Sequence, residues 1–383
     1  MTTKKTLVIV GMRESSHLQT WIKHLVMESI FSKIVIVPSD YPTKTSYSHF
    51  KNMIKSNKNL KIYQIKIFKS LDVYLFRILD YIFDLYWRNW ILRFVNIIFR
   101  PQFIHFHELQ HGAYINLFGK TINSKQNKST IVASIWGSDL QMYYKLPEHK
   151  SNLSKVMRFT DILTSERSSD EEIARQLGFQ GKFYSPVFIS VGQNNLFNAF
   201  NLVRTSERRF VLIKGYQNNF GRALNSLAAI ERIPNSLKNF KFFVYSPAKS
   251  VKFQVHYLKN FMDFDIECLP RIKHEELLEL MKKSRLYIGL STSDGLPVSM
   301  VEAMQFGVFP IQSQESSAKD FFVNGEGGFI VDPWDVVGLA SKIQESLVND
   351  FLVDQAAKIN KYSLNKKYLL DEGLKKFKLI YSN

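Results

Sequence analysis

Residues 285–310 predict a strand, a turn and a helix in immediate succession. Arg285 to Leu290 is typical of a short buried strand, and the apolar residues after Pro297 recur at helical spacing. Asp294 and Gly295 turn the chain, and Pro297 suits the first position of a helix. The first turn of such a helix leaves backbone N–H groups without intrahelical partners, at the positive end of the helix dipole. We therefore expect an anion site suited to phosphate where this helix begins.

Two carboxylates flank the expected phosphate site. Asp294 lies on the turn, and Glu302, eight positions later, lies about one helical turn inside the helix. Carboxylates repel phosphate but accept hydrogen bonds from hydroxyls, and a sugar nucleotide carries hydroxyls at both ends of its diphosphate. An ordinary surface turn followed by an amphipathic helix with one solvated glutamate explains the same pattern. The stretch alone leaves both interpretations open.

The charge balance predicts an anionic partner. The 383 residues include 51 Lys and Arg against 34 Asp and Glu, a formal net charge of +17, which fits nucleic acid, an anionic membrane or phosphorylated substrates. The single cysteine, Cys268, excludes an intrachain disulfide and indicates a reducing compartment. No apolar run is long enough for a signal peptide or a spanning helix, so a cytoplasmic protein is expected.

Two successive series of strands and helices predict an α/β protein with two Rossmann-like domains. The first series opens with a strand at Thr6 to Val10, and Gly11 at its carboxyl end stands where open α/β sheets bind ligands. The second restarts at Arg209 to Ile213. We expect a first domain over residues 1–190, a second domain over 191–365 and a C-terminal helix over 366–383 that can pack back on the first domain.

Residues 71–100 are dense in aromatics and interrupted by charges, which favours one or two amphipathic helices over a spanning helix. Trp87, Arg88, Trp90 and Arg93 predict a face that lies on an anionic membrane. Seven lysines without any Asp or Glu between residues 41 and 70 add to the basic character. A pair of ordinary core helices is the alternative.

Four segments of the second half carry a resemblance to a known family. They are Leu269 to Arg271 followed by His274 to Leu277, the acidic pair Asp294 and Glu302, the helix Met300 to Met304 with Gly307, and the glycine-rich segment Asn324 to Val331. In these segments the chain resembles the nucleotide-binding domain of the family 4 glycosyltransferases, retaining enzymes of the GT-B fold and of the bacterial surface-polysaccharide type. The first half resembles the family only in layout.

The resemblance implies roles for residues of the second half. Glu302 would bind the ribose hydroxyls and Asp294 would lie near the donor sugar, and these two are the catalytic candidates. The family's usual diphosphate-binding Arg position holds Tyr216, so Lys214 and Arg222 take that role. The remaining expected donor-binding residues are Arg271, Gly295, Leu296, Pro297 and Val298.

The first half departs from the family pattern. Trp136 stands where family members often have a histidine before Gly-Ser-Asp. Gly11, His107 and Asp139 are therefore the acceptor-side candidates. A short segment of the sequence contains His105, His107, Glu108 and His111. Their spacing suits either a polar cleft, which we favour, or a metal site.

Together with the resemblance, these observations predict a glycosyltransferase that moves a sugar from a nucleotide-sugar, bound in the second domain, to a glycan or lipid-linked acceptor, such as a lipopolysaccharide core, bound in the first. The resemblance implies retention of anomeric configuration. No metal or other cofactor is expected, and the protein is expected to lie peripherally on the anionic inner face of the cell membrane. A GT-B epimerase or phosphorylase is the alternative. A basic nucleic-acid-binding protein is another, but the aromatics form no RNA-binding signature, so we expect no nucleic acid partner.

Overall fold

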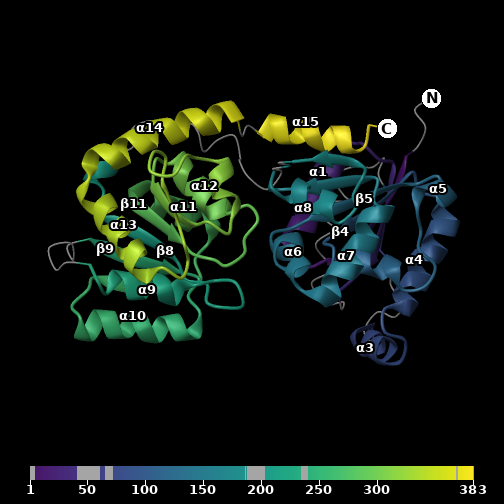
Figure 1. Cartoon of the computed structure of the whole chain (residues 1–383), viewed down its shortest axis with the longest axis horizontal. Helices are drawn as coiled ribbons and strands as arrows, with labels where there is room; N and C mark the ends of the chain where they lie inside the picture. The colour runs from purple at the N-terminus through teal and green to yellow at the C-terminus, as the bar shows by residue number, and fades with distance from the viewer. Residues whose placement is uncertain are drawn as a thin grey trace. The chain divides into compact units, whose positions relative to one another are not determined.

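The computed structural model describes residues 5–40, 61–64, 72–185, 187, 203–233, 240–367 and 370–382. The chain divides into two compact units (Figure 1). Unit 1 comprises Met1–Ser190 and Gly373–Asn383, and unit 2 comprises Val191–Glu372. The predicted C-terminal segment 366–383 is therefore shared between the units, with most of it in unit 1.

Unit 1 is built on a parallel sheet of seven strands in the order β3-β2-β1-β4-β5-β6-β7. The strands are β1 (Thr6–Gly11), β2 (Lys33–Pro38), β3 (Lys61–Gln64), β4 (Phe103–His107), β5 (Thr130–Ile135), β6 (Ile162–Ser165) and β7 (Lys182–Tyr184). Every residue of β1 is buried, because helices cover both faces of the sheet and both sets of alternating side chains are apolar. This explains why the strands read as continuous apolar runs.

The helices of unit 1 cover both faces of this sheet, either directly or by packing on another helix (Figure 1). They are α1 (Ser16–Met27), α3 (Asp72–Phe83), α4 (Tyr86–Phe99), α5 (Ser124–Asn127), α6 (Ser138–Gln141), α7 (Pro147–Phe159), α8 (Asp170–Gln176) and α15 (Leu370–Ile380), with 3-10 turns η1 (Ala113–Leu117) and η2 (Tyr143–Lys145). Leu7 and Ile9 of β1 pack with α1 and α15, whereas Val8 and Val10 pack with α4, α7 and α8.

The helix α15 completes the core of unit 1, beside α1 in Figure 1. Phe377 and Ile380 are fully buried, and the Tyr381 hydroxyl accepts a hydrogen bond from Nε1 of Trp21 at 2.8 Å. The same hydroxyl lies 2.6 Å from Nδ1 of His105. A segment that follows unit 2 in the sequence is thus part of the hydrophobic and polar core of unit 1.

Unit 2 is built on a second parallel sheet, in the order β10-β9-β8-β11-β12-β13. The strands are β8 (Phe210–Lys214), β9 (Lys241–Tyr245), β10 (Ile266–Cys268), β11 (Ser284–Gly289), β12 (Phe309–Ser313) and β13 (Phe329–Val331). The helices are α9 (Ala223–Ile230), α10 (Lys249–Phe261), α11 (His274–Lys283), α12 (Val298–Gln305), α13 (Val336–Val348) and α14 (Asp350–Lys367), with 3-10 turns η4 (Thr205–Glu207) and η6 (Ser317–Asp320). Helices α9, α10 and α13 pack with Val211, Ile213 and Ile288, while α11 and α12 pack against each other and β11.

The predicted α/β class with two Rossmann-like domains is confirmed by these parallel sheets. The strand β7 and the helix α7 were not predicted: β7 is a three-residue edge strand, and the buried side chains of α7 stand among many polar ones. The predicted helices of residues 71–100 are present as α3 and α4. Of the predicted lysine-rich stretch 41–70, only residues 61–64 are described.

The predicted exposed Trp and Arg face of α4 is wrong in part. Trp87 and Arg88 are buried, and the Arg88 guanidinium lies 2.9 Å from the Asp80 carboxylate of α3. Trp90 is exposed, and Arg93 donates a hydrogen bond to the carbonyl of Lys120. The ion pair of Arg88 and Asp80 thus holds α3 against α4, as expected for the alternative of ordinary core helices. No helix in the described part of the chain is both long and apolar enough to cross a bilayer.

Candidate functional site

The helix α12 begins at the carboxyl edge of the unit 2 sheet, directly after β11. Pro297 precedes the helix rather than occupying its first position, and no side chain caps the first turn. The preceding loop is anchored to the segment after β12: the Asp294 N–H donates to the Glu315 carbonyl, and the Gly295 carbonyl accepts from the N–H and hydroxyl of Ser317. Such a held loop keeps the positive end of the helix dipole at the sheet edge.

Lys214 and Asp294 form an ion pair beside this helix start. The strands β8 and β11 are neighbours, which brings Lys214 Nζ to 3.3 Å from Asp294 Oδ2 although the residues lie far apart in sequence. Burial alone would lower the pKa of Lys214, but the Asp294 carboxylate and the Tyr245 hydroxyl outweigh it and raise the pKa above its usual range. Lys214 therefore remains a cation at neutral pH, as a diphosphate site requires.

Glu302 makes a second acid–base pair, with His274. The first residue of α11, His274, places Nε2 at 2.8 Å from Glu302 Oε1. The Glu302 side chain is 11% exposed and that of His274 57% exposed, so an exposed imidazole covers a largely buried carboxylate. Burial raises the pKa of Glu302, and the contact with His274 opposes that shift. The sequence predicted no role for His274, because it placed this residue in a motif but did not show its contact with Glu302.

Arg222 and Arg271 are less closely tied to the helix start. The Arg222 guanidinium donates to the carbonyls of Asn218, at 3.0 Å, and Gly221, at 2.8 Å, and lies over the Trp334 ring at 4.7 Å. These contacts hold its own loop. Arg271 is exposed in the loop between β10 and α11. The structure thus brings together Lys214, Asp294 and the α12 start, and gives Arg222 a structural task that sequence could not reveal.

The carboxyl edge of the unit 1 sheet carries the predicted acceptor-side residues. At Gly11, an added Cβ would stand 2.9 Å from the Cβ of His107, so only glycine fits between β1 and β4 without a shift. Asp139 Oδ2 accepts hydrogen bonds from the N–H groups of Leu109 and Trp136, which joins the ends of β4 and β5. Burial raises the pKa of Asp139 to about 7, against the effect of these two bonds.

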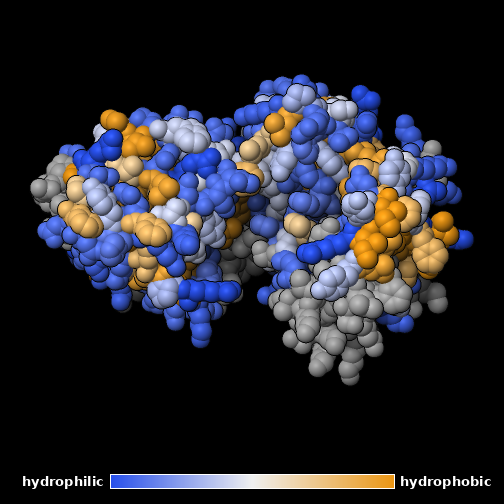
Figure 2. All heavy atoms as spheres, turned by 90° about the horizontal axis from the view of Figure 1, so that it is seen from below, coloured by the Kyte–Doolittle hydropathy of each residue, from blue (hydrophilic) through white to orange (hydrophobic). Residues whose placement is uncertain are grey.

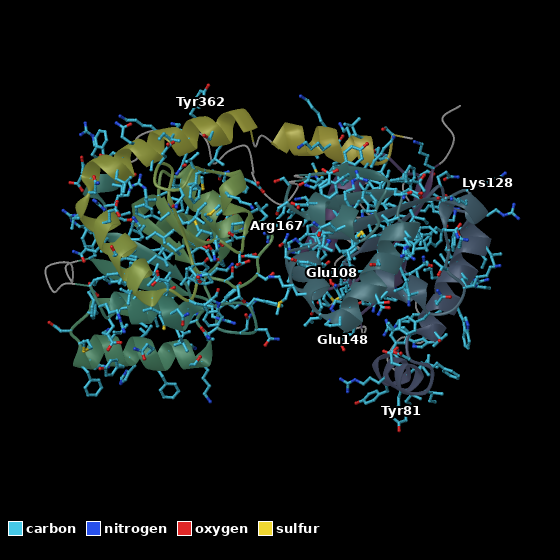
Figure 3. All side chains as sticks on the ribbon, in the orientation of Figure 1. Tyr81, Glu108, Lys128, Glu148, Arg167 and Tyr362 are labelled. Atoms are coloured by element: carbon cyan, nitrogen blue, oxygen red, sulfur yellow. The ribbon has the colours of Figure 1, made fainter. Side chains whose placement is uncertain are left out.

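Glu108 follows β4 and is the less expected residue of this edge. Its φ of 69° is uncommon for a residue other than glycine. Burial raises the pKa of Glu108 to about 8, and the Asp139 and Asp40 carboxylates add to the shift. Figure 3 shows Glu108 on the same side of unit 1 as Arg167, which follows β6. A strained backbone together with a raised carboxyl pKa is typical of functional positions.

His107 does not contact the surface. Its side chain is buried, its ring stacks on Trp136 with centroids 5.8 Å apart, and neither ring nitrogen has a hydrogen-bond partner in the structure. Burial, followed by His105 and His17, lowers its pKa well below the usual range. The predicted direct contact of His107 with an acceptor is not supported by this burial, and a neutral supporting side chain fits better. Among the described residues, no three His, Cys, Asp or Glu side chains meet as metal ligands.

The two parallel sheets with helices on both faces are those of a known fold. Over 99% of both chains, the structure is similar to Anabaena Alr3699/HepE in complex with UDP and glucose, with a TM-score of 0.67 and 13% identity. An S. aureus TarM mutant in complex with fondaparinux, alpha-GlcNAc-glycerol and UDP matches at TM-score 0.67 and 10% identity, over 99% of this chain and 100% of that chain. The sucrose-phosphate synthase of Thermosynechococcus elongatus matches at TM-score 0.67 and 11% identity over 98% of each chain. The predicted GT-B fold is therefore confirmed.

The family match is confined to the second half of the chain. Residues 188–366, just under half of the chain, match the family described as "Glycosyl transferases group 1". No match is found among curated protein sequences. The predicted resemblance of the second half is confirmed at the level of group 1 glycosyl transferases. Assignment to family 4, retention and surface-polysaccharide synthesis remain predictions.

Proposed function

We propose that the protein is a glycosyltransferase that takes its sugar from a nucleoside diphosphate sugar. One observation carries the proposal: at the carboxyl edge of the unit 2 sheet, the uncapped start of α12 lies between the pairs Lys214–Asp294 and His274–Glu302. A cation and a helix N-terminus suit the diphosphate, and the carboxylates suit the hydroxyls on either side of it. The match of residues 188–366 to group 1 glycosyl transferases supports this interpretation.

Each residue then has a task in the transfer. Lys214 and the positive end of the α12 dipole stabilise the charge that grows on the departing diphosphate. Glu302 accepts hydrogen bonds from the ribose hydroxyls, and His274 orients its carboxylate and opposes the rise of its pKa on burial. Asp294 holds Lys214 and reaches toward the sugar. The bond from the anomeric carbon to the diphosphate oxygen breaks, a bond to an acceptor hydroxyl oxygen forms with retention of configuration, and the hydroxyl proton passes to the departing diphosphate oxygen.

The donor that we propose is a UDP-sugar, and the acceptor is proposed only by its chemical class. The complexes of Anabaena Alr3699/HepE contain UDP, glucose or UDP-glucose, so UDP and its sugars are the first donors to test. For the acceptor we propose a glycan or lipid-linked hydroxyl that meets the Gly11, Glu108 and Asp139 edge of unit 1. The charge of +17 supports a place on the anionic inner face of the cell membrane.

A thermal-shift screen of nucleoside diphosphates and their sugars tests the donor proposal. We expect one base to stabilise the wild type and to lose most of that effect in Glu302→Ala, because a ligand that binds only the folded state raises its stability. Glu279→Ala on the neighbouring α11 is the matched control, since Glu279 is exposed and pairs with Lys282. Stabilisation that is absent, or equal in both variants, contradicts the proposal. Product analysis with and without acceptor separates a transferase from an epimerase or phosphorylase.

A further inference from the structure

Helices α3 and α4 expose an unusually apolar surface on unit 1. The apolar face comprises Tyr81, Ile82, Trp90, Phe94, Ile97 and Ile98. The α4 members recur at helical spacing on the side opposite the buried Leu92 and Val95, and Phe94 and Ile97 are 63% and 67% exposed. Figure 2 shows hydrophobic side chains gathered in this part of unit 1, and Figure 3 shows Tyr81 projecting away from it. A patch of this kind marks an interaction site.

A basic groove lies at the amino-terminal edge of the same unit's sheet. It has a volume of about 890 Å³, and Lys125, Lys128, Arg158 and Lys182 line it near the starts of β5, β6 and β7. Asp161 is the one acidic residue among the described residues that line it. Its carboxylate already accepts hydrogen bonds from the Ser124 hydroxyl and the Ile131 N–H, both at 2.7 Å. The groove therefore presents a positive surface.

The segment of residues 117–125 connects the basic groove with α4. The Phe118 ring lies 5.5 Å from that of Tyr86 at the start of α4, and Arg93 of α4 donates to the Lys120 carbonyl at 3.1 Å. Further along, Leu117, Thr121 and Lys125 line an adjoining lobe of about 440 Å³ that also contains Lys155 and Arg158. Apolar and basic side chains are thus neighbours on one unit.

We propose that the apolar face and the basic groove together form the surface by which unit 1 docks on an anionic phospholipid bilayer. The aromatic and aliphatic side chains suit the boundary between head groups and acyl chains, and the cations suit lipid phosphates. The complementary charge favours this occupant over a second copy of the chain, because two like basic grooves would repel. The groove lies at the amino-terminal edge of the sheet, so docking leaves the edge with Gly11 and Asp139 open.

This inference deepens the proposed function. It rests on that function only for the reason why the protein would attach to a membrane. The first test measures binding of the full chain to neutral and anionic phosphatidylglycerol vesicles over a range of salt, without donor or acceptor. The apolar variant is Trp90→Ser with Phe94→Ser, and its control is Phe351→Ser with Tyr362→Ser, two exposed aromatics of α14. We expect binding to anionic vesicles to weaken roughly tenfold in the apolar variant and less than twofold in the control.

The second test reverses charge in the groove. Lys155→Glu with Arg158→Glu is matched by Lys249→Glu with Lys252→Glu on α10, which changes the net charge equally. The groove variant should bind anionic vesicles roughly tenfold less at low salt and lose part of its salt dependence, while the control changes little. Equal losses in both, or no vesicle binding by the wild type, overturn the proposal.

Two further measurements test whether a second copy of the chain binds the apolar face and whether the variants keep the donor site. Light scattering that shows a wild-type dimer, dispersed by the apolar variant, would assign the apolar face to a second copy and overturn the proposal. The nucleotide thermal shift should be unchanged in all four double variants. Because vesicle binding is measured without any nucleotide, failure of the docking surface leaves the proposed donor site standing, and the reverse also holds.

Discussion

The carboxyl edges of the two sheets both carry acidic side chains, but in opposite surroundings. In unit 2, Asp294 lies against Lys214 and Glu302 against His274, so each carboxylate has a basic partner. In unit 1, Asp139 is held by backbone N–H groups, and Glu108 is crowded by Asp139 and Asp40. The same architecture therefore provides one edge with paired charges and one edge whose carboxyl groups hold their protons near neutral pH.

This difference suits the two ligands that we propose for the two units. A diphosphate carries full negative charge, and the paired edge of unit 2 supplies a cation together with the start of α12. An acceptor hydroxyl is neutral, and carboxyl groups with a pKa of about 7 and about 8 can donate as well as accept hydrogen bonds to it. The following predictions test this contrast, in order of decreasing effect.

Removing the cation of unit 2 has the largest expected effect. Lys214→Met should lower kcat/KM by roughly 100-fold or more, because the proposed site would lose the half-buried cation that stabilises developing charge. Initial rates at several donor concentrations measure this. Lys241→Met is the control, since Lys241 pairs with Glu267 at the other side of β9. A change below threefold in Lys214→Met would show that the ion pair with Asp294 is only structural.

A pH effect on stability is expected for unit 1. Because the pKa of Asp139 is raised to about 7, the folded protein binds this proton more tightly than the unfolded chain, so the stabilisation is complete below pH 4 and is lost as the pH rises to 7. Between pH 4 and pH 8, the free energy of unfolding should therefore fall by roughly 1–4 kcal/mol less in Asp139→Asn than in the wild type. Urea unfolding followed by tryptophan fluorescence reports mainly unit 1, since only Trp334 lies in unit 2.

Glu148→Gln is the matched control for the pH experiment. Its side chain is 81% exposed on α7 of the same unit. The pH dependence of this variant should follow that of the wild type. If Asp139→Asn also follows the wild type, the carboxyl group of Asp139 is already ionised in the folded protein at acidic pH, and the contrast between the two edges disappears.

A smaller effect is expected at His274. His274→Ala should raise the donor KM about threefold to tenfold with little change in kcat, because the imidazole orients Glu302 and does not touch the breaking bond. His274→Gln keeps a hydrogen-bond donor at this position and should restore most of the affinity. Loss of kcat in both variants would instead place His274 in direct contact with the reacting groups.

The smallest change is expected at Arg222. Arg222→Lys should lower the free energy of unfolding by about 1 kcal/mol, because lysine cannot reproduce the planar donors that hold the carbonyls of Asn218 and Gly221 or stack equally on Trp334. Diphosphate affinity, measured by calorimetry, should fall less than threefold. A fall of tenfold or more would restore the diphosphate-binding role that the sequence predicted for Arg222.

The sequence predicted helices and strands better than it predicted which side chains meet. The strands predicted at Thr6 to Val10 and at Arg285 to Leu290 are found within one residue as β1 and β11, because each is a buried run with clear boundaries. The edge strand β7 was missed because three residues carry too little periodicity. Sheet order decides which distant strands are neighbours, so local pattern could not reveal that Lys214 meets Asp294.

Burial of charged groups was the other limit of sequence reasoning. An amphipathic pattern does not show that Asp80 of the preceding helix pairs with Arg88 and allows its burial. It also does not show that the His107 ring lies beneath Trp136, although the alternation of β4 predicts a buried strand. Asp294 and Glu302 could be proposed from sequence because a short motif keeps both carboxylates on one loop and helix, and their roles remain predictions.

The return of α15 to unit 1 has a consequence for biosynthesis. Lys5 Nζ donates a hydrogen bond to the Tyr381 carbonyl at 3.1 Å, so residues from both sides of unit 2 in the sequence close the same core. Residues 1–190 leave the ribosome before unit 2 is made, whereas Phe377 and Tyr381, which complete their core, are made after it. During translation the earlier half is therefore the one that stays incomplete, and chaperones would meet its open surface between α1 and β1.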